Sequence, residues 1–248
     1  PAPVVVQSLG RFRVLRDGRP VPSAAWQSRK ARELLKILVA RDGRPIPREA
    51  LMEALWPEQS PAPLGNRLSV LLSTVRAVLD PEKRFDPEHF VAADRGAVWL
   101  EVDHLELDVR RFVGAARDAL DARRAGDRRG HARLVRAEEL YAGDFLEEDA
   151  YEDWAVSRRE EARALYTELA RALADDCAAD GDPDAAARYY RRILERDSYD
   201  EPAHLGLVTA LEAAGRHGEA RRAYRAYCGR MDTIGAESAP FPRAPARP

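Results

Sequence analysis

The chain has 248 residues, of which 45% are hydrophobic and 33% are charged, with a formal net charge of −2. This composition is typical of a soluble globular protein, and the length favours two domains. No apolar run approaches the roughly 18 residues that a membrane span needs, and no signal peptide opens the chain, so we expect a cytoplasmic protein without membrane contact. Cys177 and Cys228 lie in separate helix patterns, which favours two free thiols over a disulfide. The chain begins at Pro1 without Met, which leaves open an upstream domain in a longer protein.

The two ends of the chain differ in charge. Residues 1–102 contain 16 Lys and Arg against 12 Asp and Glu, whereas residues 103–248 contain 24 against 30. A basic first part joined to an acidic second part is consistent with a nucleic-acid-facing domain attached to a protein-facing one.

Residues 4–47 predict a β-hairpin followed by a helix. Short strands are expected over residues 4–7, 12–15 and 19–21, with Asp17-Gly18 as a tight turn. Ser28 can cap a helix over residues 29–41, which Asp42-Gly43 would end. A brief strand over residues 44–47 should follow.

Residues 48–102 predict two helices and a second hairpin. Pro47 stands where a missing N–H costs nothing, residues 48–56 form an amphipathic pattern, and Pro57 ends it. A loop over residues 59–63 leads to a longer helix over residues 64–79. Strands over residues 90–92 and 97–102 then flank a turn at residues 93–96.

The longer helix has two unlike faces. Leu64, Leu68, Leu71, Leu72, Val75 and Leu79 fall on one side at 100° per residue. The opposite side is small and uncharged apart from Arg67, unlike a solvated face crowded with Glu and Lys. Such a face suits contact with a flat polar surface, such as the floor of a DNA groove.

Two helices at a turn followed by a hairpin form the plan of a winged helix-turn-helix. In that plan the second helix, here residues 63–79, enters the major groove and the hairpin tip reaches the neighbouring backbone. Val70 is a candidate thymine-methyl contact, with burial against the wing as the alternative, and the hydroxyl residues could simply tolerate a helix surface. The candidate DNA-binding residues are Arg48, Asn66, Arg67, Ser69, Val70, Ser73, Thr74, Arg76 and Arg95.

From residue 108 the pattern is helical, with a repeat. A shift of 34 residues aligns Gly181 with Gly215, Ala186 with Ala220, and Tyr190 with Tyr224, and Gly206 is a further small contact point. This is the tetratricopeptide period, in which paired helices stack. We therefore predict an α+β winged helix-turn-helix domain over residues 1–102, an all-α tetratricopeptide-like domain over residues 103–236, and a disordered tail over residues 237–248.

Other residues are interpreted as structural. Trp56, Trp99 and Trp154 are expected in the core, and Glu147-Glu148-Asp149 as a solvated loop. Aromatic and apolar residues between Tyr141 and Trp154, with Tyr151 among them, should dock on the first domain or on the repeats. The histidines lack metal-ligand spacing and no Gly-rich phosphate loop is present, so we expect no enzyme, metal or cofactor.

Several segments together resemble one family. In the first half these are Leu9–Phe12, Arg29–Leu35, Arg48–Leu51, Leu55–Pro57, Asn66–Leu68 and Ser73–Arg76, and in the second half Tyr141–Leu146, Asp153–Ala155 and Gly215–Ala220. Over about residues 8–235 the chain resembles the SARP-type bacterial transcriptional regulators, which join a winged helix to a bacterial transcriptional activator domain. The resemblance implies binding to double-stranded promoter DNA and recruitment of RNA polymerase.

One departure keeps a second function open. Reading helices in this family usually carry more Arg, whereas Leu71 and Ser73-Thr74 occupy such positions here. Since phosphate contacts supply most non-specific affinity, tandem sites, a homodimer or an upstream domain could compensate. The alternative is a repeat-type protein-interaction module, part of a longer signalling protein, whose winged helix has weak or no DNA affinity.

Overall fold

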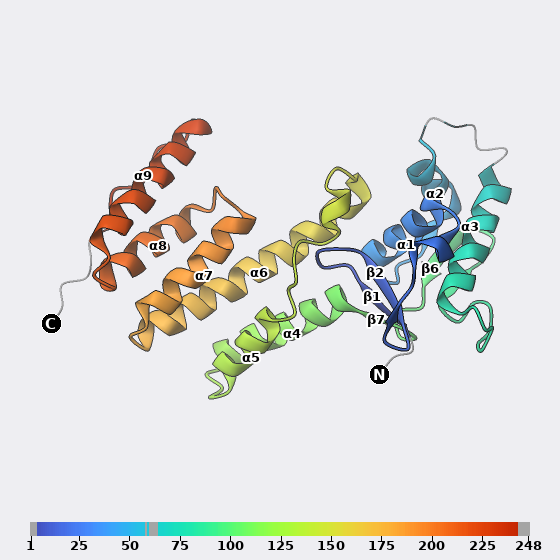
Figure 1. Cartoon of the computed structure of the whole chain (residues 1–248), viewed down its shortest axis with the longest axis horizontal. Coiled ribbons are helices and arrows are strands. Elements are labelled where there is room, and N and C mark those ends of the chain that lie inside the picture. Colours follow the sequence, from blue (N-terminus) through green and yellow to red (C-terminus); the bar gives the residue numbers. More distant parts are fainter. Residues whose placement is uncertain (1–3, 58, 60–63, 243–248) are drawn as a thin grey trace. The chain divides into compact units, whose positions relative to one another are not determined.

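The computed structural model describes residues 4–57, 59 and 64–242 (Figure 1). Contacts divide the chain into unit 1, Pro1–Val113 with Leu140–Ala162, and unit 2, Gly114–Glu139 with Arg163–Pro248. Both units therefore combine segments that are distant in sequence. The domain boundary after Val102 remains a prediction, because it follows the order of the sequence rather than these contacts. The residues 60–63 of the predicted loop and residues 243–248 of the predicted tail lie outside the described residues.

Unit 1 opens with a four-stranded sheet in the order β3-β2-β1-β7. Its strands are β1 (Val4–Gln7), β2 (Arg13–Arg16), β3 (Arg19–Pro20) and β7 (Glu106–Leu107). Asp17 and Gly18 have φ of 46° and 75°, which confirms the predicted hairpin turn. Strand β7 pairs in parallel with β1, and its two residues are too few to show a strand pattern in the sequence.

The rest of unit 1 contains the winged helix. Helices α1 (Arg29–Arg41), α2 (Arg48–Leu55) and α3 (Leu64–Leu79) precede a three-stranded sheet in the order β4-β6-β5, from β4 (Ile46–Pro47), β5 (Val91–Ala93) and β6 (Ala97–Leu100). Ser28 Oγ accepts a hydrogen bond from Lys30 N, and Asp42 ends α1 in the left-handed region. The predicted α+β winged helix is confirmed.

A short 3₁₀ helix, η1 (Ser23–Trp26), precedes α1 and was not predicted. Trp26 is buried and packs 6.3 Å from the ring of Phe12. Trp56, Trp99 and Trp154 are only half-buried, so their assignment to the core was wrong. The indole N–H groups of Trp99 and Trp154 donate to the nearby carboxylates of Glu101 and Glu152, which keeps these rings near the surface.

Residues 140–162 complete unit 1. Leu9 and Phe145 form an isolated β-bridge, Leu146 N donates to Ser8 O at 2.8 Å, and Gly10 N donates to Asp144 O at 2.8 Å. Phe145 and Leu146 are fully buried. Of the two docking sites left open for this segment, the contacts with residues 8–10 therefore select the first domain rather than the repeats. Tyr151 does not belong to this cluster, because it is 99% exposed.

The acidic run in this segment is an ion-pair cluster. It forms the short helix η2 (Glu147–Asp149). Lys36 Nζ on α1 lies 2.5 Å from Asp149 Oδ2, and the Lys36 side chain is 7% exposed. Arg32 of the same helix pairs with Glu148. The prediction of a solvated loop was wrong for Asp149, whose carboxylate compensates a cation that the fold removes from water, whereas Glu147 and Glu148 are exposed as predicted.

One buried arginine fixes the course of this turn. The Arg159 guanidinium donates to the carbonyl oxygens of Phe145, Leu146, Asp149 and Ala150. A planar cation with five N–H donors can satisfy several converging carbonyls at once. The segment is thereby held by a donor that comes from α6.

Unit 2 is helical. Its elements are α4 (Asp108–Arg124), α5 (Gly130–Glu138), α6 (Asp153–Ala179), α7 (Pro183–Arg196), α8 (Glu201–Ala213) and α9 (His217–Thr233), with the first parts of α4 and α6 in unit 1. Asp182 and Asp200 cap α7 and α8 by accepting from the backbone N–H three residues on. Among the described helices, none combines the length and apolar composition needed to cross a membrane.

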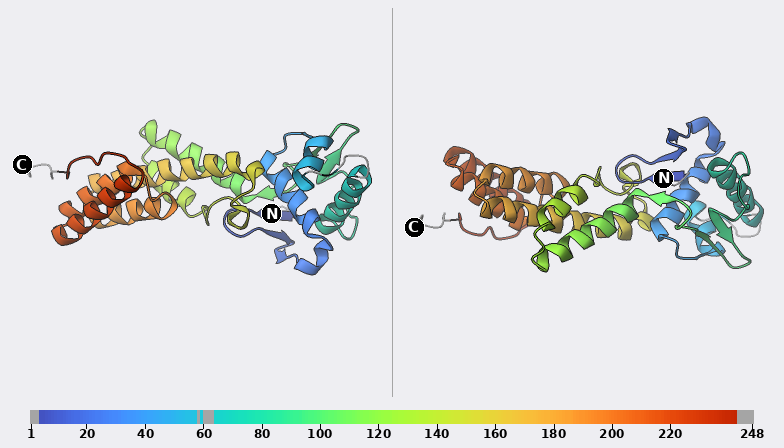
Figure 2. Two further views of the ribbon diagram at one scale, coloured as in Figure 1. Left: turned by 90° about the horizontal axis from the view of Figure 1, so that it is seen from above. Right: turned by 90° about the horizontal axis from the view of Figure 1, so that it is seen from below.

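The three last helices pack as the 34-residue period predicts. Helix α8 lies between α7 and α9 (Figure 2). Ala186 and Ala220, equivalent positions in the repeat, are both fully buried in the shared core. A Cβ at Gly206 would lie 2.4 Å from the Tyr190 ring, so glycine permits this approach of α7 to α8. The all-α repeat fold is confirmed.

The start of the predicted tail is ordered against α9. Tyr224 Oη donates to Ala239 O at 2.8 Å, and the Phe241 ring packs edge-on to Tyr224 with centroids 5.1 Å apart. The prediction of disorder is therefore wrong for these residues. The Pro- and Ala-rich composition suggested disorder, but this segment also contains Phe241, whose ring holds it against α9.

A stack of rings at the base of the wing makes stability depend on pH. His89 stacks on His104 at 4.0 Å and on Phe85 at 4.2 Å. Burial, and then the neighbouring His104, lower the pKa of His89 below its ordinary value of about 6.5. The unfolded chain therefore binds the proton more strongly, and stability present above about pH 6.5 is lost as the pH falls through the folded-state pKa.

We expect the melting temperature to fall between pH 7.5 and 5.5, and to fall less in the His89→Phe variant, which keeps a stacked ring without a titrating group. Thermal melts across this range measure both. An identical acid-induced loss in the variant would show that other groups cause it.

Candidate nucleic-acid interface

Helix α3 has the two faces that its sequence predicts. All six residues predicted to face inward are buried, together with Val78. Asn66, Arg67, Ser69, Val70, Ser73 and Ala77 are exposed, and Thr74 is half-buried. Val70 is 64% exposed, which excludes the alternative of burial against the wing.

The hydroxyl groups on the outer face of α3 are turned back onto the helix. Ser69 Oγ donates to Gly65 O at 3.0 Å, Ser73 Oγ to Ser69 O at 3.1 Å, and Thr74 Oγ1 to Val70 O at 3.0 Å. Each proton is used within the helix, so these hydroxyls offer acceptor lone pairs to a ligand. Beyond Asn66 and Arg67, the outer face is therefore uncharged and poor in free donors.

A hollow of about 390 Å³ lies along this face, lined by Gln27, Ser69, Val70, Ser73, Thr74 and Ala77. Gln27 follows η1, which packs against α3. Gln27 is not among the residues predicted from the sequence, because no local pattern shows that a residue 42 positions before Ser69 lines the same hollow. The remaining lining residues come from α3, and all of them except Ala77 are candidate DNA-binding residues of the sequence.

Arg67 is held in place at the start of α3. Its Nη1 donates to Gln59 Oε1 at 2.9 Å, and its guanidinium lies 5.7 Å from the Trp56 ring centroid. The other N–H groups of the fork remain available to an anion. Asn66 is exposed on the same turn.

Arg76 has a structural contact that its sequence position does not reveal. Its Nε and Nη2 donate to Val91 O on β5 at 3.0 and 2.8 Å, and Nη2 lies 3.4 Å from Glu88 Oε1. This side chain therefore ties α3 to the wing. A phosphate contact by Arg76 remains a prediction, and it would use the N–H groups left over.

Arg48 is hydrogen-bonded to the backbone of the wing tip, which carries Arg95. Arg48 N donates to Gly96 O at 2.9 Å, and its Nη1 donates to Asp94 O at 3.2 Å. The Asp94 carboxylate accepts from Ala97 N and Gly96 N, and these bonds lower the pKa of Asp94. Arg95 is exposed and has no partner among the described residues. The wing turn thus places two cations beside the first turn of α2, whose N–H groups also attract anions.

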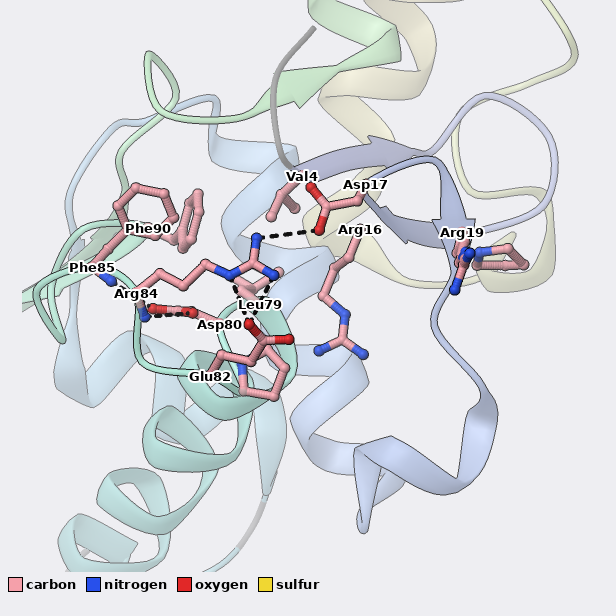
Figure 3. Close-up of a pocket in the computed structure, with 12 residues that line it drawn as sticks. Val4, Arg16, Asp17, Arg19, Leu79, Asp80, Glu82, Arg84, Phe85 and Phe90 are labelled. Atoms are coloured by element: carbon pink, nitrogen blue, oxygen red, sulfur yellow. Dashed lines mark hydrogen bonds and ion pairs between the residues drawn. The ribbon is translucent and has the colours of Figure 1, made fainter.

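A second hollow of unit 1 has a different character. It measures about 450 Å³ and lies between the β2–β3 hairpin and the loop after α3. Figure 3 shows the Arg84 guanidinium between the carboxylates of Asp17 and Glu82, at 3.4 and 2.8 Å. Arg16 and Arg19 also line this hollow and have no ion-pair partner among the described residues, but it shares no lining residue with the hollow along α3.

Among the described residues, no group of three His, Cys, Asp or Glu side chains is placed to hold a metal ion. Cys177 and Cys228 are free and half-buried. Burial raises the pKa of the Cys177 thiol, which keeps it protonated and unreactive.

Two family models match the chain. The bacterial transcriptional activator domain matches residues 107–240, and the C-terminal domain of transcriptional regulatory proteins matches residues 24–96. The second match covers the three helices, β4, β5 and the wing turn, and it ends before β6. The first covers α4 to α9 and ends before Phe241.

Known relatives extend over both parts. The transcriptional regulatory protein EmbR of Mycobacterium bovis and of Mycobacterium tuberculosis is 28% identical over 242 residues, which are 95% of this chain. The chain spans 60% of the length of these relatives. The solved structure of Mycobacterium tuberculosis EmbR in complex with a low-affinity phosphopeptide has a TM-score of 0.80 at 24% identity, and the match covers 97% of this chain and 63% of that one. The structural likeness supports the fold.

Proposed function

Because the chain belongs to the SARP-type bacterial transcriptional regulators, which are not enzymes, we propose that it binds promoter DNA by placing α3 in the major groove. The observation that carries this proposal is the outer face of α3, which is exposed and uncharged apart from Arg67 at its start. A helix of this shape and charge suits the floor of a groove whose walls are phosphates.

The cations of this proposal lie at two places, the start of α3 and the wing tip. Arg67 lies at the start of α3, whereas Arg48 and Arg95 lie at the wing tip. Phosphate contacts at both places would fix the register of the helix without reading sequence. Asn66, Ser69, Val70, Ser73 and Thr74 then face base edges.

Unit 2 supplies the protein contacts in this proposal. Stacked helical pairs present extended surfaces that bind proteins. RNA polymerase is the partner that the family implies, and a second copy of the chain or a domain upstream in a longer protein are further candidates. Activation of transcription, rather than repression, follows from recruitment of polymerase.

One observation favours the alternative of an interaction module with little DNA affinity: Arg67 is the one basic residue on the outer face of α3. Gel-shift titration with promoter DNA from the chain's own genomic neighbourhood separates the two. Binding that weakens steeply with salt supports the regulator, and absence of binding at low salt supports the interaction module.

The double variant Arg67→Ala, Arg95→Ala should bind DNA more weakly, and the slope of log K against log salt should be smaller in magnitude by about two units, since each phosphate contact contributes roughly 0.9. Arg221→Ala is the matched control, because Arg221 is exposed on α9 in unit 2. An unchanged slope in the double variant would mean that α3 and the wing do not face DNA.

A further inference from the structure

The helical side of the hollow along α3 offers methyl groups and acceptors. The hydroxyl protons of Ser69, Ser73 and Thr74 are used on backbone carbonyls. Val70 is 64% exposed and Ala77 is exposed beside it. A ligand that fits this side presents apolar groups, or donors aimed at the hydroxyl lone pairs.

Gln27 supplies the free donor at the rim of the hollow. Its amide is exposed and has no partner among the described residues, so it can donate and accept at the same time. Its backbone has φ of 55°, in the left-handed region that non-glycine residues rarely adopt. Such conformations persist where the surroundings determine them, and they concentrate at functional sites.

The residues on either side of Gln27 hold its backbone in the left-handed conformation. Trp26 is buried against Phe12, and Ser28 caps α1 through Lys30 N. The residue is thus fixed on both sides, and its backbone does not have to be ordered when a ligand binds. Residues preorganised in this way contribute specificity at low entropic cost.

We propose that this hollow reads A·T base pairs in the major groove, with the Gln27 amide on adenine and with Val70 and Thr74 against thymine methyl groups. The inference rests on the proposed function. In the major groove adenine presents an acceptor and a donor side by side, which one amide matches, and thymine presents the groove's only methyl group. Guanine presents two acceptors, which arginine and lysine match best, and no charged residue is in the lining of this hollow.

The first experiment is a selection of binding sites from randomised duplexes by the full chain. The enriched site should contain A·T pairs at the positions that α3 covers. Replacing these thymines one at a time by deoxyuridine removes single methyl groups, and should weaken binding about 3- to 5-fold at one or two positions, as expected for one buried methyl. Val70→Ala and Thr74→Ser should each abolish the effect of deoxyuridine at one position.

Thr209→Ser is the matched control for Thr74→Ser. Thr209 is exposed on α8 and makes the same bond to the carbonyl four residues before it, at 2.9 Å. This variant should retain the full sensitivity to deoxyuridine. Equal affinity of the wild-type chain for thymine and deoxyuridine at every position would overturn the proposal.

The second experiment changes the base preference through Gln27. Gln27→Glu replaces the donor by acceptors, which suit the amino group of cytosine, so one selected position should change from adenine to cytosine by about 10-fold or more. Gln27→Gly keeps the left-handed backbone and should lose the preference at that position with an unchanged melting temperature.

The outcomes separate the inference from its premise. An enriched site with G·C pairs under α3, or an unchanged preference in Gln27→Glu, overturns the reading of A·T pairs while DNA binding stands. If no duplex is enriched, the proposed function fails, and the inference fails with it.

Discussion

Asp149→Ala should lower the free energy of unfolding by about 3–5 kcal/mol, because it leaves the Lys36 ammonium buried without its partner. Lys36 Nζ lies 2.5 Å from Asp149 Oδ2 and 3.9 Å from Glu148 Oε2, and the Lys36 side chain is 7% exposed. The remaining carboxylate of Glu148 is more distant and 36% exposed, so it compensates only part of this charge. Urea denaturation of the full chain measures the loss.

A double variant tests whether the buried Lys36 charge causes the loss of stability. Lys36→Met combined with Asp149→Ala removes both charges and keeps the apolar stem beside Phe12, so it should recover most of the lost stability. Glu82→Ala is the control for an exposed pair. Its ion pair with Arg84 is also short, 2.8 Å, but both side chains are more than half exposed, and its loss should cost less than about 1 kcal/mol. Equal losses in Asp149→Ala and Glu82→Ala would contradict the argument from burial.

Ala220→Arg should destabilise unit 2 by on the order of 2–4 kcal/mol, since it overpacks a helix crossing and buries a charge. Ala220 is fully buried in the core that α7, α8 and α9 share. Because repeat helices stabilise mainly their neighbours, the damage should stay in unit 2 and leave DNA binding by unit 1 intact. Thermal melts and gel shifts on this variant measure the two effects separately.

Ala226→Arg is the matched control, because Ala226 is exposed on the same helix. It should leave the melting temperature nearly unchanged, since arginine is a good helix former on a solvated face. A melting temperature as low as that of Ala220→Arg would show that position on α9, rather than helix packing, sets the cost.

The sequence alone was sufficient wherever a short-range rule controls the backbone. The helix period separated the inner and outer faces of α3, and the 34-residue period identified Ala186 and Ala220 before any contact was known. Asp17-Gly18 and Asp42-Gly43 ended their elements as predicted, because both turns require positive φ. These features depend on spacing within a few residues, or on exact repetition, and both are visible in the sequence.

Most of the candidate site could be predicted in the same way, since its residues lie on one helix and one hairpin. What could not be predicted is how each side chain is used. Arg76 was expected to reach outward, yet its guanidinium donates to Val91 O. Ser69, Ser73 and Thr74 were candidate DNA contacts, yet their hydroxyl protons return to the helix. Such choices depend on which acceptors lie nearest in space.

Only the tertiary structure decided the contacts between distant segments. It placed Gln27 along α3, paired β7 with β1, and set Asp149 against Lys36 across 113 residues of sequence. The acidic run looked like a solvated loop because composition carries no information about a buried cation elsewhere in the chain. Periodicity determined which face of each element is buried. The identity of the partner on that face was decided by folding, because burying a charge or a backbone carbonyl is favourable only beside the group that compensates it.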